Sequence, residues 1–213
     1  MTITELSAEF DILYNNITSN QAPGLSEYEK SVFLTQAQEA IVTELYNGNL
    51  KDSFESSEAY TRYLSSLVTE CRVTSAESKD SSVCGIKLTN IELDDDVLFI
   101  VYECAVVAGK TVIVTPTSHD SFYKIIENPF KGPNNRRAIR LSSGNTLEVY
   151  TTDNIDSYTY RYIKRPVPII LTDLSSDTIN GEDEKSTTLD VPEVLHRTIL
   201  LRAVQLAKAV WQN

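Results

Sequence analysis

The sequence predicts an α+β fold in which N-terminal helices and a C-terminal helix form a helical layer around a central, mainly antiparallel β insertion. Three observations lead to this prediction. Apolar residues recur at helical spacing near both ends of the 213-residue chain, they alternate or cluster in the middle, and turn signals separate the middle segments. The predicted domains are a helical unit at 1–73, a β-rich insertion with one short helix at 83–171, an exposed loop or arm at 172–190, and a helix at 191–213 that packs on the helical unit.

The N-terminal unit is predicted to contain three helices. In the first, at 2–20, apolar residues recur every three or four positions, and Thr2 with Glu5 has the spacing of a capping box. The third helix is expected at 58–72, where one face gathers apolar side chains. The residues of that face are Tyr60, Leu64, Leu67, Val68 and Cys71.

The second helix has defined start and stop signals. The hydroxyl of Ser26 can cap its first turn while Glu29 reaches back, and Asn47 with Gly48 is a typical end. Its predicted apolar stripe consists of Leu25, Tyr28, Val32, Ala37, Ala40, Ile41 and Leu45.

In the middle of the chain the period changes from helical to extended. A polar linker is expected at 74–82, followed by strands that are rich in β-branched and apolar residues. The predicted strands cover 86–88, 97–107, 111–114, 138–141, 146–151 and 157–163, with a short helix at 118–127 and a rigid proline-containing loop at 128–135. Ser143, Gly144 and Asn145 predict a hairpin turn.

The last part of the chain returns to helical spacing. Pro166 and Pro168 are expected to hold 167–171 at a sheet edge or outside the sheet. After the polar segment, the final helix begins near Pro192, and its end at Trp211 is a candidate for packing in the core or against a neighbouring subunit. The stripe of this helix consists of Val194, Leu195, Ile199, Ala203, Leu206, Ala207 and Val210.

The charge balance favours protein partners. The chain has 19 Lys and Arg residues against 30 Asp and Glu residues, a net charge of -11, whereas binding to nucleic acid or to an anionic membrane needs a basic surface.

Neither a signal peptide nor an apolar run of membrane-spanning length is present, so the protein is expected to be made and to stay in the cytosol. Three cysteines without a C-x-x-C pair predict neither a disulfide framework nor a zinc site.

Three short motifs resemble chemical sites and lack what those sites need. The sequence at 108–111 matches the end of a phosphate-binding loop, but Cys104 stands where its first glycine belongs and a strand follows. His119 and Asp120 resemble a metal pair, yet the only other histidine, His196, is expected on the polar side of the last helix. The three aspartates at 94–96 lack the glycine and glutamate of a calcium loop and predict a solvated turn.

No catalytic residue, cofactor or metal is therefore predicted. The cysteines sit in apolar stretches or beside turns, and no nucleophile, base and orienting group can be assembled from the motifs. Two functions remain open at this point: a small cytosolic hydrolase that uses His119 and Asp120, and a protein-interaction domain.

Basic residues concentrate in one part of the chain. Residues 124–165 contain eight Lys and Arg residues and four acids, a local charge of +4 that leaves -15 for the rest. Opposite charges on two sides of one subunit suit head-to-side pairing of copies in a ring, although a solvated sheet face with local ion pairs explains them equally well. The candidate interface residues are Lys131, Arg136, Arg137, Arg140, Arg161, Lys164, Arg165, Asp94, Asp95 and Asp96.

Several segments, spread in order over most of the chain, resemble a structural protein of tailed bacteriophages, in particular the crAss-like phages and related phages of gut Bacteroides. The segments are SEYEKSVFLTQAQE at 26–39, NPFKGP at 128–133, YRYIKRP at 160–166, PIIL at 168–171 and PEVLH at 192–196.

The resemblance implies a head-to-tail connector or tail ring protein of the virion, assembled in the host cytoplasm. It implies a cyclic ring, of about 12 copies, that lies beneath the portal protein, contacts other tail ring proteins and continues the channel for genome DNA. An acidic protein suits such a channel, because a negative wall does not hold a passing polyanion. The DNA is expected to pass without sequence-specific binding, and no membrane partner is expected.

Overall fold

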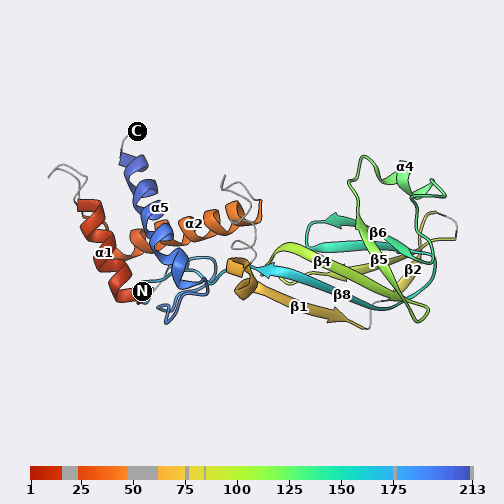
Figure 1. Cartoon of the computed structure of the whole chain (residues 1–213), viewed down its shortest axis with the longest axis horizontal. Helices are drawn as coiled ribbons and strands as arrows, with labels where there is room; N and C mark the ends of the chain where they lie inside the picture. Colours follow the sequence, from red (N-terminus) through yellow and green to blue (C-terminus); the bar gives the residue numbers. More distant parts are fainter. Residues whose placement is uncertain (16–23, 48–61, 75–76, 84, 175–176, 212–213) are drawn as a thin grey trace. The chain divides into compact units, whose positions relative to one another are not determined.

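The chain folds as two units, one of which is inserted into the other (Figure 1). The computed structural model describes residues 1–15, 24–47, 62–74, 77–83, 85–174 and 177–211, except for the side chain of Trp211. The first unit comprises Met1–Leu67 with Arg165–Asn213, and the second comprises Val68–Lys164. The molecule is thus α+β, with helices near both ends of the chain and the sheet between them.

Within the described ranges, the first unit contains three long helices and one turn of 3-10 helix. These are α1 (Ile3–Asn15), α2 (Glu27–Tyr46), η1 (Ser65–Leu67) and α5 (Glu193–Trp211). Residues 62–64 are helical as well. Helix α5 packs against both α2 and α1, as Figure 1 shows. Its buried face includes Leu195, Ile199, Ala203 and Ala207 of the predicted stripe. It also includes Leu200 and Val204, which the stripe lacks, whereas Val194 and Val210 of the stripe are exposed. The apolar core of this unit includes Leu6, Phe10, Leu34, Ile41, Ile199, Ala203 and Ala207.

Both predicted capping boxes are present. The Thr2 hydroxyl accepts from the Glu5 backbone N–H at 3.2 Å, and the Glu5 carboxylate accepts from the Thr2 N–H at 2.9 Å. Ser26 and Glu29 repeat this arrangement at the start of α2, with the Ser26 N–H 2.8 Å from the carboxylate. Backbone hydrogen bonds of this kind lower the pKa of both glutamates, because they favour the charged form. The end of the predicted first helix, at 16–20, lies outside the described residues.

Helix α2 is confirmed, but its buried face differs from the predicted stripe. Tyr28 is 40% exposed, although it was expected on the apolar face. Several polar side chains are buried instead: Lys30, Ser31, Thr35 and Gln38. A search for apolar residues alone therefore misplaces the inward side of this helix.

The polar residues of α2 are buried because they bind the extended segment at 165–171. The Ser31 hydroxyl accepts from the Leu171 N–H, and the Thr35 hydroxyl accepts from the Ile169 N–H, both at 3.0 Å. These bonds satisfy backbone groups that no sheet partner serves. The segment thus lies outside the strands, as its prolines predict, and clusters with the helices of the first unit.

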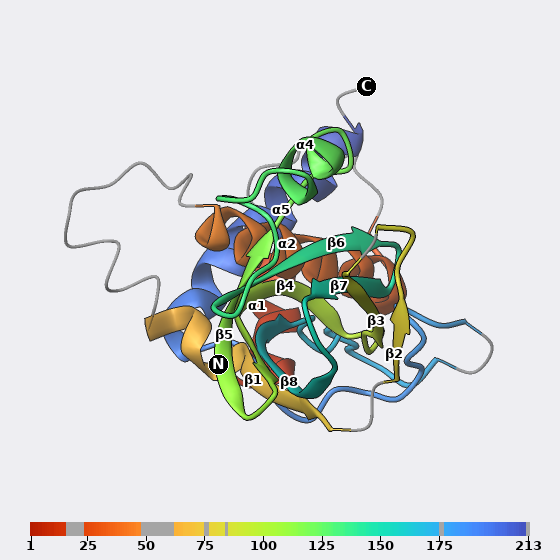
Figure 2. The same cartoon turned by 90° about the vertical axis from the view of Figure 1, so that its right-hand side faces the viewer.

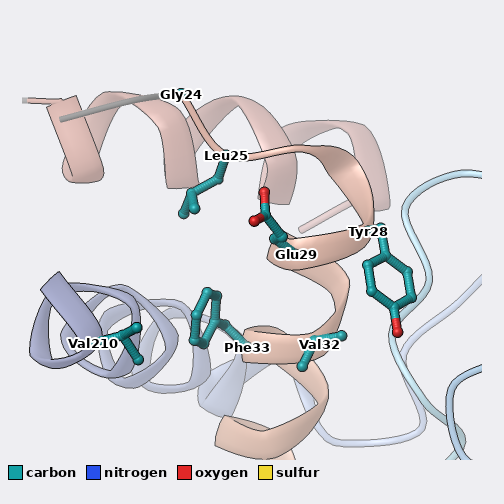
Figure 3. A pocket seen from close by; sticks show the side chains of 7 residues that line it. All are labelled: Gly24, Leu25, Tyr28, Glu29, Val32, Phe33 and Val210. Carbon is teal, nitrogen blue, oxygen red and sulfur yellow. The ribbon is translucent and has the colours of Figure 1, made fainter.

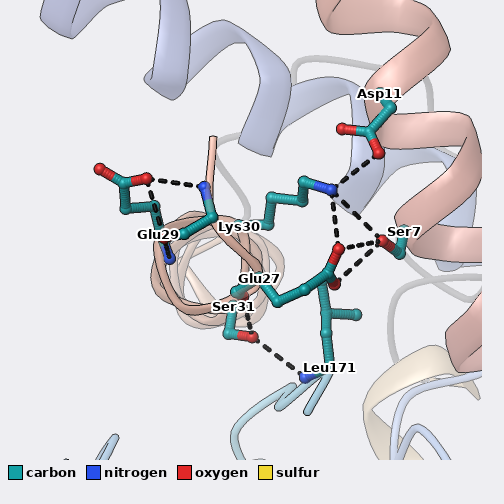
Figure 4. Close-up of polar contacts among 8 residues, drawn as sticks. Ser7, Asp11, Glu27, Glu29, Lys30, Ser31 and Leu171 are labelled. Carbon is teal, nitrogen blue, oxygen red and sulfur yellow. Dashed lines mark hydrogen bonds and ion pairs between the residues drawn. The ribbon is translucent and has the colours of Figure 1, made fainter. Parts of the chain in front are cut away.

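A buried lysine joins α1 to α2 (Figure 4). The side chain of Lys30 is 4% exposed, and its Nζ lies 2.7 Å from Asp11 and 2.9 Å from Glu27. The Ser7 hydroxyl of α1 also donates to Glu27, at 3.0 Å. Burial by itself lowers the pKa of Lys30, but the hydrogen bonds with the two carboxylates outweigh burial and raise the pKa above its ordinary value. The lysine thus stays charged between the two helices.

The polar segment before α5 is exposed along most of its length and is hydrogen-bonded to its own unit. The Ser186 hydroxyl donates to the Pro168 carbonyl and accepts from the Ile170 N–H, both at 2.8 Å. Ile179 is buried and forms a small bridge with Glu182.

The second unit is an eight-stranded mixed sheet with one short helix. The strands are β1 (Val68–Val73), β2 (Ser78–Asp80), β3 (Lys87–Glu92), β4 (Val97–Val107), β5 (Lys110–Pro116), β6 (Arg137–Ser143), β7 (Thr146–Thr151) and β8 (Ile155–Lys164), and the helix is α4 (Phe122–Ile126). Their order is β1-β8-β4-β5-β6-β7-β3-β2. Only the β5–β6 pair among these neighbours is parallel.

Two predictions before the insertion are wrong. Residues 68–72, expected at the end of a helix, form strand β1 and pair with β8, so the first domain boundary lies at Leu67 rather than at 73. The expected linker at 74–82 contains strand β2. The helical spacing of the apolar residues was misleading, because Val68 and Val73 are β-branched and favour a strand once a partner strand is available.

The sheet curls around its own core (Figure 2). Apolar side chains from β3 to β8 form one buried cluster, and Cys71 and Val73 of β1 pack against it. Strand β8 contributes three buried tyrosines, Tyr158, Tyr160 and Tyr162, whose rings lie in tilted contact. The Ile155 N–H at the start of β8 donates to the Ser78 hydroxyl of β2 at 3.2 Å, so β2, at one end of the strand order, comes close to β8, which is second from the other end.

Helix α4 covers a second, smaller core on the other face of the sheet. Phe122 and Ile126 pack on Ile139, Leu141 and Tyr150 from β6 and β7. The helix is shorter than the predicted 118–127.

The predicted hairpin at 143–145 is confirmed, and a second hairpin turn lies at 108–109. Ala108 and Gly109 join β4 to β5 with φ angles of 48° and 72°, and Gly144, at φ 60°, turns β6 into β7. Positive φ values in a two-residue loop are typical of a hairpin. The chain at 108–111 is thus a turn that leads into β5, and not a phosphate-binding loop.

Candidate assembly surfaces

The residues considered for hydrolysis do not form a catalytic group. His119 is exposed, and its Nε2 lies 2.9 Å from the Ser142 carbonyl, which can only accept a hydrogen bond. Asp120 is exposed as well, and a hydrogen bond from Ser118 lowers the pKa of its carboxyl. Among the described residues, no group of three or more His, Cys, Asp or Glu side chains could hold a metal ion.

His196 was expected on the polar side of the last helix, and this prediction is wrong. The residue is 7% exposed, and its Nε2 lies 3.0 Å from the Val191 carbonyl. The carbonyl satisfies the ring nitrogen, so a histidine fits this buried position of α5.

None of the helices within the described ranges is long and apolar enough to cross a membrane.

A buried polar network lies on the core face of the sheet. The side chains of Glu103 and Arg140 are 8% and 12% exposed, and Arg140 Nε lies 2.9 Å from the Glu103 carboxylate. The Tyr158 hydroxyl donates to the same carboxylate. Burial, together with the charge of Glu103, raises the pKa of Tyr158, which stays protonated. Every partner is satisfied within the sheet, so the network serves stability and not catalysis.

The outer face of β4, β5 and β8 exposes apolar side chains. Ile113 of β5 is 72% exposed and Tyr102 of β4 is 52% exposed. Beside them, the Arg161 guanidinium lies 5.8 Å from the centre of the Tyr102 ring and pairs with Glu70 at 2.6 Å. We call this surface the outer sheet face.

The loop between α4 and β6 presents a single aromatic side chain to solvent. Among the large apolar residues of the described ranges, Phe130 is the most exposed, at 87%. Lys131 and Arg136 of the same loop are exposed as well. We call residues 128–137 the Phe130 loop.

Hydrogen bonds fix the Phe130 loop. The Asn128 side chain accepts from the Phe130 N–H at 2.9 Å, and the Arg137 guanidinium donates to the Phe130 carbonyl at 3.2 Å. A Cβ atom at Gly132 would stand 2.9 Å from the carbonyl oxygen of Ile126, so this close turn needs a glycine. The exposed ring is thus held on a preformed backbone.

An apolar pocket of about 550 Å³ lies in the first unit (Figure 3). Leu25, Tyr28, Val32 and Phe33 contribute from the start of α2 and the residues before it, and Val210 contributes from the end of α5. In Figure 3, Leu25, Phe33 and Val210 face a common space, with the Glu29 carboxylate nearby. We call this feature the α2 pocket.

The basic interface candidates lie on different elements. Arg140 belongs to the buried network and Arg137 to the Phe130 loop, whereas Arg161 lies on the outer sheet face. Lys164 ends β8 and Arg165 begins the second part of the first unit. The candidates exposed on the Phe130 loop are Lys131 and Arg136.

The acidic candidates form the turn between β3 and β4. Asp94 and Asp95 are exposed, and Asp95 accepts from the Asn145 side chain at 2.7 Å. Asp96 is half-buried. The side chain of Trp211 lies outside the described residues, so its packing stays a prediction.

Two features were missed by sequence reasoning, and each left a signal. Leu25, Tyr28 and Val32 have helical spacing but do not share the inward face of α2, which also carries small polar residues. The spacing of these three residues is the signal of a second apolar face on α2. Phe130 lies between Pro129 and the glycine-proline pair at 132–133, a pattern that holds a residue on a rigid turn.

Comparison with known proteins identifies the family. The family described as phage tail ring protein 3/4 matches residues 1–213. The chain is 39% identical to ring protein 3 of Bacteroides phage crAss001 over 222 residues, which cover 97% of this chain and 95% of that protein. It is 36% identical to ring protein 4/5 of the same phage over 226 residues, which cover 100% and 94%. These are structural proteins of the virion and not enzymes. The chain therefore belongs to the phage tail ring protein 3/4 family.

Proposed function

We propose that the chain forms a cyclic ring in the head-to-tail connector or tail, below the portal protein, and that this ring continues the channel for genome DNA. The observation that carries the proposal is the similarity, along almost the whole chain, to two ring proteins of one phage. A phage with two such proteins has rings built from related subunits, and rings of related subunits are suited to stacking on one another.

The described surfaces support an assembling subunit. Both units expose large apolar side chains, among them Phe130 in the second unit and Val194 in the first. Single exposed apolar residues are common, but an aromatic residue on a preformed loop and an open apolar pocket are typical of contact sites. The ring therefore has surfaces with which to contact its neighbours.

The charge of the subunit supports passage of DNA. With a net charge of -11, a ring of such subunits repels phosphates on average. At a wall of net negative charge, the counterion release that drives nonspecific DNA binding is small. DNA is then expected to move through the ring without being held.

Electron microscopy and native mass spectrometry test this proposal. The purified chain is imaged alone and after addition of the portal protein and the other ring proteins of its phage. We expect closed rings of this chain, with a central channel, in at least one of these samples. If neither sample contains rings, the proposed function is wrong.

A further inference from the structure

The Phe130 loop presents an apolar group, and the α2 pocket presents an apolar space. The loop offers an aromatic side chain that is 87% exposed, and the pocket offers an open apolar space of about 550 Å³. Pockets of about 300–1,000 Å³ are typical for enclosing a group of aromatic size together with its surroundings. Because hydrogen bonds already fix the loop, little conformational entropy is lost when Phe130 is buried.

The two surfaces also complement each other in charge. No acidic residue occurs between Asn128 and Arg140, whereas Lys131 and Arg136 are exposed beside Phe130. The pocket carries Glu29, whose pKa is lowered by backbone and side-chain hydrogen bonds with Ser26.

The net charges of the two units differ in the same direction as the charges of the pocket and the loop. The first unit has 8 basic and 17 acidic residues, a net charge of -9, and the second has 11 and 13, a net charge of -2. A basic loop of the second unit is therefore attracted to the first unit of another copy.

We propose that Phe130 of one subunit inserts into the α2 pocket of a second copy of this chain, with Lys131 and Arg136 facing Glu29 at its rim. Loop and pocket are formed by different residues of the chain, one in each unit, so the contact is heterologous. Repetition of a heterologous contact produces a ring when the rotation closes. This inference rests on the proposed ring function and names the contact that would build the ring.

A complementation experiment tests the contact. Phe130→Ala removes the inserted ring, and Val32→Arg fills the pocket with a positive charge that repels the basic loop. We expect each variant alone to weaken association between copies by at least about tenfold, as for a central interface residue. An equimolar mixture of the two variants is expected to form dimers and stop there, because one intact loop can enter one intact pocket. Native mass spectrometry and light scattering measure these states.

Two further variants serve as controls. Ile113→Ala removes another exposed apolar side chain, at 72%, from the outer sheet face and should leave ring formation unchanged. Glu29→Gln keeps the capping hydrogen bonds and removes the charge, so it should weaken assembly mainly at low salt. Thermal unfolding of every variant shows whether its fold is intact.

The outcomes separate the inference from the proposed function. If the wild type forms rings, alone or with its phage partners, and folded Phe130→Ala and Val32→Arg chains do so equally well, the inference is wrong while the ring function stands. If these variants still form their own ring but no longer join another ring protein, the pocket holds that other protein and not a second copy. If the wild type forms no ring in either condition, the ring function fails and the inference fails with it.

Discussion

Glu103 and Arg140 show how burial decides the value of an ion pair. Their side chains are 8% and 12% exposed, whereas those of Glu70 and Arg161 are 50% and 56% exposed. Removing one partner of a buried pair leaves an uncompensated charge in a medium of low polarisability, while water screens an exposed pair. Sequence alone could not separate the two arginines, because both lie in strands and both were predicted at the interface.

We expect Arg140→Met to lower the free energy of unfolding by about 3 kcal/mol, because it strands the Glu103 carboxylate. The matched change Arg161→Met should cost less than about 1 kcal/mol. Urea unfolding followed by circular dichroism measures both. Adding Glu103→Met to Arg140→Met should recover part of the loss, since no buried charge then remains. Equal losses for the two single variants would show that the buried network is not the stabilising element.

The strands and helices differ in how well the sequence predicted them. The bounds of β4 and β7 agree with the predicted ranges of 97–107 and 146–151, because runs of β-branched and apolar residues have no competing helical interpretation there. Strand β1 was missed, since its apolar residues also fit helical spacing and only pairing with β8 decides between them. The inward face of α2 was missed because its polar residues bind backbone groups from a distant segment, which no local pattern reveals.

Strand β8 makes stability depend on alkaline pH. Burial raises the pKa of Tyr158 and Tyr160 well above the usual value for tyrosine. Above about pH 10 the unfolded chain loses these protons while the folded chain keeps them, so unfolding becomes easier as pH rises.

We therefore expect the urea midpoint to fall between about pH 9 and pH 11. Tyr160→Phe should reduce the slope of the free energy of unfolding against pH by at most about 1.4 kcal/mol per pH unit, because one titrating group is removed. The comparison of slopes matters, since Lys30, whose pKa is also raised, adds to the fall in both proteins. Identical slopes for the wild type and Tyr160→Phe would contradict a role for this tyrosine.

At the scale of the whole molecule, an insertion divides the chain. The helices of the first unit come from both sides of Val68–Lys164, whereas the sheet is continuous in sequence. The sequence predicted this arrangement because helical spacing occurs near both ends and extended patterns occur between them. The α2 pocket and the Phe130 loop could not be predicted as a pair, because they lie on different units and sequence gives no depth or exposure.

We expect Val68–Lys164 to fold when it is expressed alone. The curled sheet buries one apolar cluster that draws on seven of its eight strands, and α4 covers a second cluster, so each face that must be buried has a partner within this segment. The isolated segment should show the circular dichroism of a sheet, a cooperative thermal transition and dispersed amide resonances. Ala138→Asp is the matched control, because Ala138 is fully buried and a charge there has no partner. If the isolated segment is as unfolded as this variant, then the sheet depends on the helical unit for its stability, and the insertion cannot have the independent core described here.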